Sequence, residues 1–175
     1  MLQTSDYTFS NVTATDIPLL ARWLTTPDLR RWWGDPEEEL AIIDEDRINP
    51  LMTTLLVHYR GNPFAYVQDY DVASWPQPHL RDLPAGTRAV QTFIGEPSMH
   101  GRGHAARYLR ERIGQLHRDG VPVVAIDPLE ENTRAVAAYR KAGFENAGMV
   151  YVNGSIVVRL LCATPRPEAG QIHAA

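Results

Sequence analysis

Cysteine, long apolar runs and basic clusters are the features that this sequence has least of. The chain has a single cysteine, Cys162, so it cannot form a disulfide within itself, and we expect a reducing, cytoplasmic setting. No stretch approaches about 18 uncharged apolar residues, the length that a membrane-spanning helix needs. The first residues, MLQTSDYTFS, lack a basic start followed by an apolar run. We therefore expect neither a signal peptide nor a membrane partner.

The charge pattern also narrows the function. The net charge is −4 and basic residues form no tract, which argues against a nucleic-acid partner. Acidic residues gather at 35–39 and 44–46. They are either a solvated helix face or a rim that attracts a cationic substrate. His100 and His104 are four residues apart, but they straddle a loop and a helix start, so we predict no metal site.

Cys162 ends the apolar run 156–161. A free cysteine in such a run is typical of a small buried hydrophobe, and the alternative is a nucleophile. The 175 residues suffice for one domain with a real core, which we predict over 1–163. We predict a frayed tail over 164–175.

Hydrophobic periodicity predicts the elements of the first half. A strand is expected at 7–12, and then a helix capped by Thr15 with Pro18 in its first turn. A polar, partly helical segment covers 28–47, and strands follow at 54–59 and 64–71. The proline-rich stretch 72–87 is predicted to be a long loop, and such loops often line a site.

The second half alternates strands and helices. Strands are expected at 88–95 and 121–126, with helices at 103–117 and 132–142, the latter ended by Gly143. Two more strands, 144–152 and 155–161, flank Asn153-Gly154, a strong hairpin signal. A strand–helix–strand–helix unit within a mostly antiparallel sheet predicts a mixed α/β fold.

The stretch Gln91 to Ala105, QTFIGEPSMHGRGHA, joins a strand to a helix through a glycine-containing loop. Glycine lets the backbone approach a ligand closely, and the first turn of a helix attracts an anion. Alone, such a loop is more often an ordinary turn than a phosphate site. The spacings of the P-loop and of the dinucleotide fingerprint are both absent.

A second block, Asp127 to Phe144, makes the first one specific. His100-Gly-Arg-Gly103-His-Ala105 matches the phosphate loop of the GNAT acetyltransferase superfamily, with histidine at its first position. The family's second motif, N-x-x-A-x-x-x-Y-x-x-x-G-F, is filled completely by Asn132, Ala135, Tyr139, Gly143 and Phe144. The chain thus resembles this superfamily, whose fold is a mostly antiparallel sheet with splayed central parallel strands flanked by helices.

The resemblance extends to one subgroup. The segments Arg31-Trp-Trp-Gly34, Tyr66-Val-Gln-Asp-Tyr70 and Ile126-Asp-Pro-Leu-Glu-Glu-Asn132 are similar to segments of aminoglycoside 6'-N-acetyltransferases. This likeness runs from about residue 7 to 162. Acetyltransferases of hydroxamate siderophore biosynthesis are similar as well.

The resemblance implies acetyl-CoA as cosubstrate and no metal. The backbone of Phe93 and Ile94 would pair with the pantetheine amides, and Asn132 would contact the cofactor arm. The pyrophosphate would lie on the backbone of a continuous run: Gly101, Arg102, Gly103, His104, Ala105 and Ala106.

The resemblance also implies the catalytic and acceptor residues. Tyr139 would protonate the CoA thiolate, although a tyrosine there can simply be packed. Asp127 would recognise the amine or act as base, although Asp-Pro at a strand end is also an ordinary turn. The acceptor would meet Trp32, Trp33, Tyr66, Gln68, Gln91 and Asp127. Of the adjacent tryptophans we expect one to be core, and Trp33 to face the substrate.

The predicted function is acetyl transfer to an amine of a small, aminoglycoside-like molecule, by a monomer or homodimer. The alternatives are a hydroxylamine acceptor in siderophore assembly and a non-catalytic CoA-binding module. Intact Tyr139 and Asp127 argue against the module. Gln91 stands where the aminoglycoside enzymes have an aspartate, which predicts weaker binding of cationic antibiotics because the amide has no charge.

Overall fold

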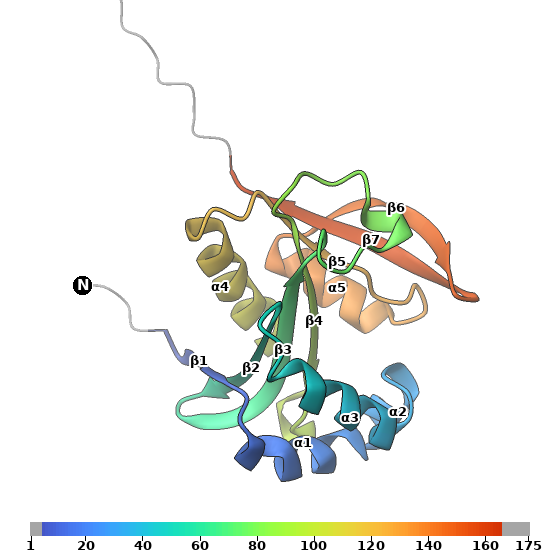
Figure 1. Ribbon diagram of the computed structural model, residues 1–175. Helices are drawn as coiled ribbons and strands as arrows, with labels where there is room; N and C mark the ends of the chain where they lie inside the picture. Colours follow the sequence, from blue (N-terminus) through green and yellow to red (C-terminus); the bar gives the residue numbers. More distant parts are fainter. Residues whose placement is uncertain (1–4, 166–175) are drawn as a thin grey trace, which may run out of the picture.

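The computed structural model describes residues 5–165, which form a seven-stranded sheet with helices on both faces (Figure 1). All neighbouring strands are antiparallel except β4 and β5, so the predicted mixed α/β fold is confirmed. The spatial order is β1 (Tyr7–Asn11), β2 (Met52–Tyr59), β3 (Asn62–Asp71), β4 (Arg88–Ile94), β5 (Val123–Ile126), β7 (Ser155–Ala163) and β6 (Glu145–Val152).

The two parallel strands touch only at their beginnings. Their register comprises two pairs, Arg88 with Val124 and Ala89 with Ala125. β3 stays paired with β4 as far as Ile94. Beyond Ala89 the edge of β4 that faces β5 therefore has no strand beside it, and the sheet splays open at its centre.

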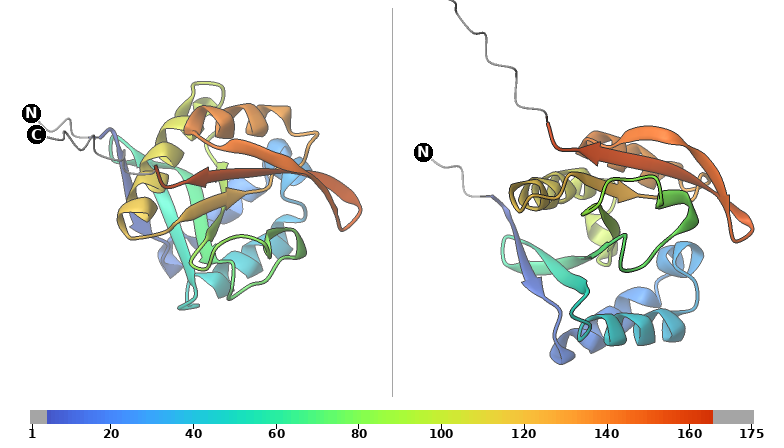
Figure 2. Two further views of the ribbon diagram at one scale, coloured as in Figure 1. Left: turned by 90° about the horizontal axis from the view of Figure 1, so that it is seen from above. Right: turned by 45° about the horizontal axis from the view of Figure 1, so that its top comes forward.

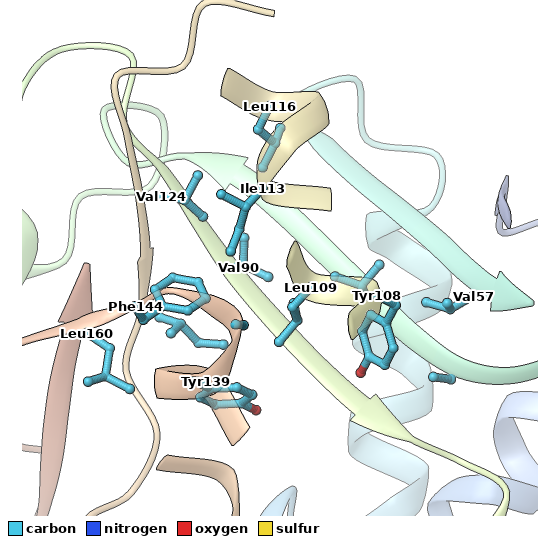
Figure 3. Close-up of a cluster of buried hydrophobic side chains, with 14 of the residues drawn as sticks. Val57, Val90, Tyr108, Leu109, Ile113, Leu116, Val124, Tyr139, Phe144 and Leu160 are labelled. Atoms are coloured by element: carbon cyan, nitrogen blue, oxygen red, sulfur yellow. The ribbon is translucent and has the colours of Figure 1, made fainter. Parts of the chain in front are cut away.

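Helices α4 (His104–Arg118) and α5 (Thr133–Ala142) cover one face of the sheet. The apolar face of α4 places Leu109 and Ile113 against Val90 and Val124 in the largest core cluster, which also holds Tyr139 from α5 (Figure 3). Burial of an aliphatic side chain contributes about 1.5–3 kcal/mol. This packing holds α4 and α5 on either side of the splay.

Three helices cover part of the opposite face: α1 (Ile17–Leu24), α2 (Pro27–Trp32) and α3 (Pro36–Asp46). The segment 28–47, predicted as one polar and partly helical stretch, is two helices separated at Gly34. Gly34 has φ +105°, a left-handed value that ends α2 cleanly. Asp35 then caps α3, because its side chain accepts from the N–H groups of Glu37 and Glu38.

Loop 72–87 covers the rest of that face, beside α1–α3 (Figure 2). It is more ordered than the sequence predicts, with a short 3-10 helix at Pro78–Leu80. Leu80 is buried against Tyr70 and Ala89 in a small core cluster, and Asp82 pairs with Arg159 of β7. Two other 3-10 turns lie at Ala14–Asp16 and Pro97–Met99.

The predicted element ends move by only a few residues. The last helix begins at Thr133 because Asn132 is its cap. Of the predicted tail 164–175, the backbone N–H of Thr164 donates to the carbonyl of Pro122 at 2.9 Å, and residues 166–175 lie outside the described part. Over residues 5–165, no helix has the length and apolar character needed to cross a membrane.

Candidate active site

A cleft of about 310 Å³ lies at the splay, between α2, the end of β4, the start of α4 and one face of α5. It brings together eleven residues that the sequence predicts for the site: Trp32, Trp33, Phe93, Ile94, Gly101, Gly103, His104, Ala105, Ala106, Asn132 and Tyr139. It is not lined by five others: Arg102, Tyr66, Gln68, Gln91 and Asp127.

The glycine loop leads directly into α4. Gly101 and Gly103 have φ values of +71° and +74°, a backbone conformation that residues other than glycine rarely adopt. Gly103 is the N-cap of this 15-residue helix, so its first N–H groups point out of the helix end. Arg107 steadies the loop by donating to the carbonyls of Arg102 and Gly103. The loop therefore presents donors to an anion without using a side chain.

His104 differs from the expectation in one respect. Its side chain is buried against Tyr59 and Phe64, and Nδ1 lies 2.7 Å from the hydroxyl of Tyr7. Burial, followed by the nearby charges of Arg107 and Arg102, lowers the pKa of His104. The imidazole thus belongs to the core, and only the backbone N–H of His104 is left for a cofactor.

The backbone of β4 also corrects one detail. Gly95 N–H donates to the carbonyl of Phe64 in β3, whereas the carbonyl of Ile94 accepts from His100 Nε2 at 3.0 Å. Backbone groups alternate sides along a strand, so Ile94 and Thr92 face the splay and Phe93 faces β3. Ile94 and Thr92 are therefore the available pair, not Phe93 and Ile94.

Small side chains and basic residues of α5 form one wall of the cleft. The Asn132 side-chain oxygen caps α5 by accepting from Ala135 N–H, and its amide N–H₂ has no partner among residues 5–165. Ala135, Ala137 and Ala138 line the cleft, followed by Lys141, the one lysine of the chain. Small side chains at these positions allow an extended ligand to lie close to the helix.

One ion pair at the cleft is not predicted by the sequence. Arg134 of α5 forms an ion pair with Asp28 of α2, and His100 lies 3.8 Å from the same carboxylate. The contact joins the two walls of the cleft across a separation of 106 residues. No local pattern could have revealed it.

Two tyrosines reach the cleft, and they differ in the use of their hydroxyls (Figure 3). Thr92 Oγ1 donates its hydrogen to the carbonyl of Tyr66. In the 2.7 Å contact between Thr92 and Tyr108, the Tyr108 hydroxyl must therefore be the donor. The hydroxyl of Tyr139 has no hydrogen-bond partner among the described residues. Burial, and then the charge of Asp127, raises the pKa of Tyr139 and keeps it protonated. Tyr139 therefore has a free proton to donate.

Gln91 and Asp127 lie near the point where the two central strands separate. Ala89 pairs with Ala125 in parallel register; Gln91 follows Ala89 by two residues in β4, and Asp127 follows Ala125 by two residues, just after β5. Gln91 is exposed there, between α1–α3 and loop 72–87. Tyr139 and Thr92 lie toward the other face. The opening thus has an acceptor side and a cofactor side.

Tyr66 and Gln68 lie beneath the acceptor side and do not line it. Tyr66 is fully buried, and its hydroxyl donates to Gln68 Oε1 at 2.5 Å. Gln68, also buried, donates through Nε2 to Gln91 Oε1 at 2.8 Å. The expected acceptor contact of Tyr66 and Gln68 is therefore replaced by support of Gln91.

Asp127 has a partner that the sequence did not indicate. Its Oδ2 lies 2.7 Å from Nε2 of His79, in the 3-10 turn of loop 72–87. Desolvation raises the pKa of Asp127, and the hydrogen bond with His79 acts in the opposite direction. Asp127 in turn contributes to the raised pKa of Tyr70, about 12, where burial is the main cause. Asp127 is thus a partly buried carboxylate, and His79 is its one side-chain hydrogen-bond partner among the described residues.

The acidic residues of segment 35–46 have two kinds of surroundings. Asp35 caps α3 and Asp44 pairs with Arg47, which are structural uses. Glu39 and Asp46 are partly buried, and desolvation raises the pKa of each. Burial is the main cause of the raised pKa of Tyr66, and the charges of Asp46 and Glu39 contribute to it.

Both tryptophans of the Arg31–Gly34 segment line the cleft, and neither is fully buried. Trp33 packs edge-on against Phe93, with ring centroids 4.8 Å apart, and against Tyr66. Arg31 lies over the ring of Trp32. Trp33, which the sequence predicts to face the substrate, is thus the one of the two that packs against the core cluster on this face, although it is only partly buried.

Cys162 is partly buried, and burial followed by Glu145 raises the pKa of its thiol, so it is not an activated nucleophile. Across residues 5–165, no group of three His, Cys, Asp or Glu side chains could hold a metal ion.

The family model of the acetyltransferase (GNAT) domain matches residues 12–152. The chain belongs to this family. A curated relative, the aminoglycoside N(6')-acetyltransferase type 1 of Klebsiella pneumoniae, is 27% identical over 152 residues, covering 79% of this chain and 74% of the relative. These matches confirm the predicted family, and with it an acetyl-CoA-dependent N-acetyltransferase.

Solved structures support the fold of this GNAT domain. AAC(6')-Ib in complex with ribostamycin and coenzyme A superposes with a TM-score of 0.80 at 24% identity, covering 94% of this chain and all of that one. An uncharacterized protein from Bacillus halodurans has a TM-score of 0.82 at 17% identity, covering 90% and 83%. At this identity both establish the architecture alone.

Proposed function

We propose that this GNAT protein transfers the acetyl group of acetyl-CoA to the amine of a cationic, aminoglycoside-like small molecule. The observation that carries the proposal is the two-sided splay. A cleft with helix-end donors and a free tyrosine proton lies on one side, and Gln91 and the His79-bound Asp127 lie at the start of the splay on the other.

The cleft fits acetyl-CoA. The N–H groups after Gly103 would hold the pyrophosphate at the start of α4. The backbone of Thr92 and Ile94 would pair with the pantetheine amides where β5 leaves β4 unpaired. Lys141 would add a positive charge for a phosphate. A bound form of the related AAC(6')-Ib with coenzyme A supports this assignment.

Asp127 and Tyr139 would each carry out one of the two proton transfers that the reaction needs. Asp127 orients the acceptor amine and takes the proton that it loses as its nitrogen attacks the thioester carbonyl. The new C–N bond forms as the C–S bond breaks. Tyr139 gives its proton to the departing thiolate and recovers one from solvent. No covalent intermediate on the enzyme is required.

The acceptor side suits a molecule with several amines. Asp127 gives it negative charge, the charges of Glu39 and Asp46 act on the buried Tyr66, and Trp33 lines the neighbouring cleft. The relatives named for aminoglycosides support the same class. Gln91 contributes an amide oxygen and no charge, which favours an acceptor with fewer cationic groups near this point.

A thiol-release assay tests the proposal. Acetyl-CoA would be offered with a kanamycin-type aminoglycoside, a linear polyamine and an N-hydroxy amine, and the product identified by mass. We expect the fastest turnover with the aminoglycoside. Preference for the N-hydroxy amine would instead support a role in siderophore assembly. Coenzyme A binding without turnover of any acceptor would indicate a binding module.

A further inference from the structure

We propose that His79 is a positioning residue that orients Asp127 toward the acceptor amine. The inference rests on the proposed function, since it assigns a role to the partner of the proposed base. Asp127 follows β5, and His79 reaches it from loop 72–87, in which the sequence predicts no site residue.

The geometry of the pair restricts its chemistry. With Asp127 ionised, Nε2 of His79 must carry the hydrogen, because a carboxylate only accepts. The other ring nitrogen, Nδ1, is buried and has no hydrogen-bond partner within residues 5–165. The neutral Nε2–H tautomer therefore leaves no buried N–H unpaired. Oδ2 is occupied by His79, and Oδ1 remains for the amine.

The exposures show which partner faces the substrate. The side chain of His79 is 6% exposed, and that of Asp127 is 30% exposed. The histidine is thus too enclosed to meet an acceptor, whereas the carboxylate is open. During transfer the amine proton would pass to Oδ1, and His79 would keep its own proton on Nε2. Asp127 would then release the proton to solvent.

The charges around Asp127 give the expected direction of the effect. Its ionisable neighbours are His79 from loop 72–87, Tyr70 from β3 and Tyr139 from α5. Desolvation raises the pKa of Asp127; the hydrogen bond with His79 is the largest of the causes that lower it, and a backbone hydrogen bond acts in the same direction. Loss of His79 should therefore raise that pKa and leave the base protonated at higher pH.

The same loop supplies a matched control. Asp82 anchors it to Arg159 of β7 with both carboxylate oxygens, at 2.7 and 2.8 Å. Asp82→Asn weakens this second anchor without touching Asp127. His79→Leu fills similar space without a donor, and His79→Gln places an amide N–H near the position of Nε2.

The experiment is the pH profile of kcat/KM for the acceptor in these variants. In His79→Leu we expect the acidic limb to move to higher pH, with about a ten-fold loss on that side, a small loss at alkaline pH and an unchanged KM for acetyl-CoA. His79→Gln should restore most of the loss, and Asp82→Asn should keep the wild-type limb. An unshifted limb in His79→Leu, or an equal shift in Asp82→Asn, would overturn the proposal.

A second measurement does not depend on the folding of a variant. Nitrogen-15 NMR of histidine-labelled wild type should show His79 as the Nε2–H tautomer at neutral pH, and an Nδ1–H tautomer would refute the pairing. A wild type that turns over no acceptor would refute the proposed function. An active wild type with an unmoved His79→Leu profile would refute only the role of His79.

Discussion

Replacing Tyr139 by phenylalanine tests the centre of the mechanism. The ring is 8% exposed and packs against Phe144, and the substitution preserves it. The hydroxyl has no partner among the described residues, so its removal leaves no protein group unpaired. The free energy of unfolding should thus change by less than about 1 kcal/mol. Any large effect must come from catalysis.

The expected catalytic loss follows from the proton that is removed. General acid catalysis contributes about 10²–10⁴-fold, so kcat should fall at least about 100-fold, or roughly 2.7 kcal/mol of barrier. The KM values should change little, because the hydroxyl acts on the thiolate that forms during the reaction. The raised pKa of Tyr139 keeps it protonated, so its ionisation should cause no loss of wild-type kcat up to about pH 9.

Tyr108 provides the matched control. It is fully buried in the same core, but its proton is taken by Thr92. Tyr108→Phe should therefore cost about 1 kcal/mol of stability and leave kcat within about three-fold. Steady-state thiol release, with thermal unfolding of each variant, makes the comparison. Full kcat in Tyr139→Phe, or an equal loss in Tyr108→Phe, would refute the assignment of the acid.

Three other substitutions test separate parts of the structure. Gly103→Val should weaken coenzyme A binding at least about ten-fold by calorimetry, because φ +74° is strained for valine and the side chain would stand at the phosphate loop; unchanged affinity would contradict the site. Gly95→Ala should lower the free energy of unfolding by about 3 kcal/mol, because its Cβ would lie 2.0 Å from the buried Trp23. Gly114→Ala should not lower it, because its Cβ meets only the flexible end of Arg118 at 3.4 Å. Thermal unfolding of the two variants makes the comparison. Gln91→Glu keeps an acceptor for the Gln68 amide and adds a charge, so KM for a kanamycin-type substrate should fall about ten-fold; no gain, with micromolar KM already in wild type, would show that the amide suffices.

Local patterns in the sequence were enough for the elements and for the cofactor motif. Periodicity places most strands and helices within a few residues because burial of one face repeats along each element. The glycine loop and the motif from Asn132 to Phe144 are contiguous, so they mark the cofactor half of the site directly. Asn132 as helix cap and Gly143 as helix end are equally local.

The tertiary structure decided the contacts between distant segments. The pairing of Asp127 with His79, and the assignment of Ile94 and Thr92 to the splay, depend on loop packing and on strand register. Likewise, His104 falls within the phosphate motif, yet its imidazole packs into the core because β1 brings Tyr7 to it. Such contacts form between residues far apart in the chain, so no spacing within the sequence records them.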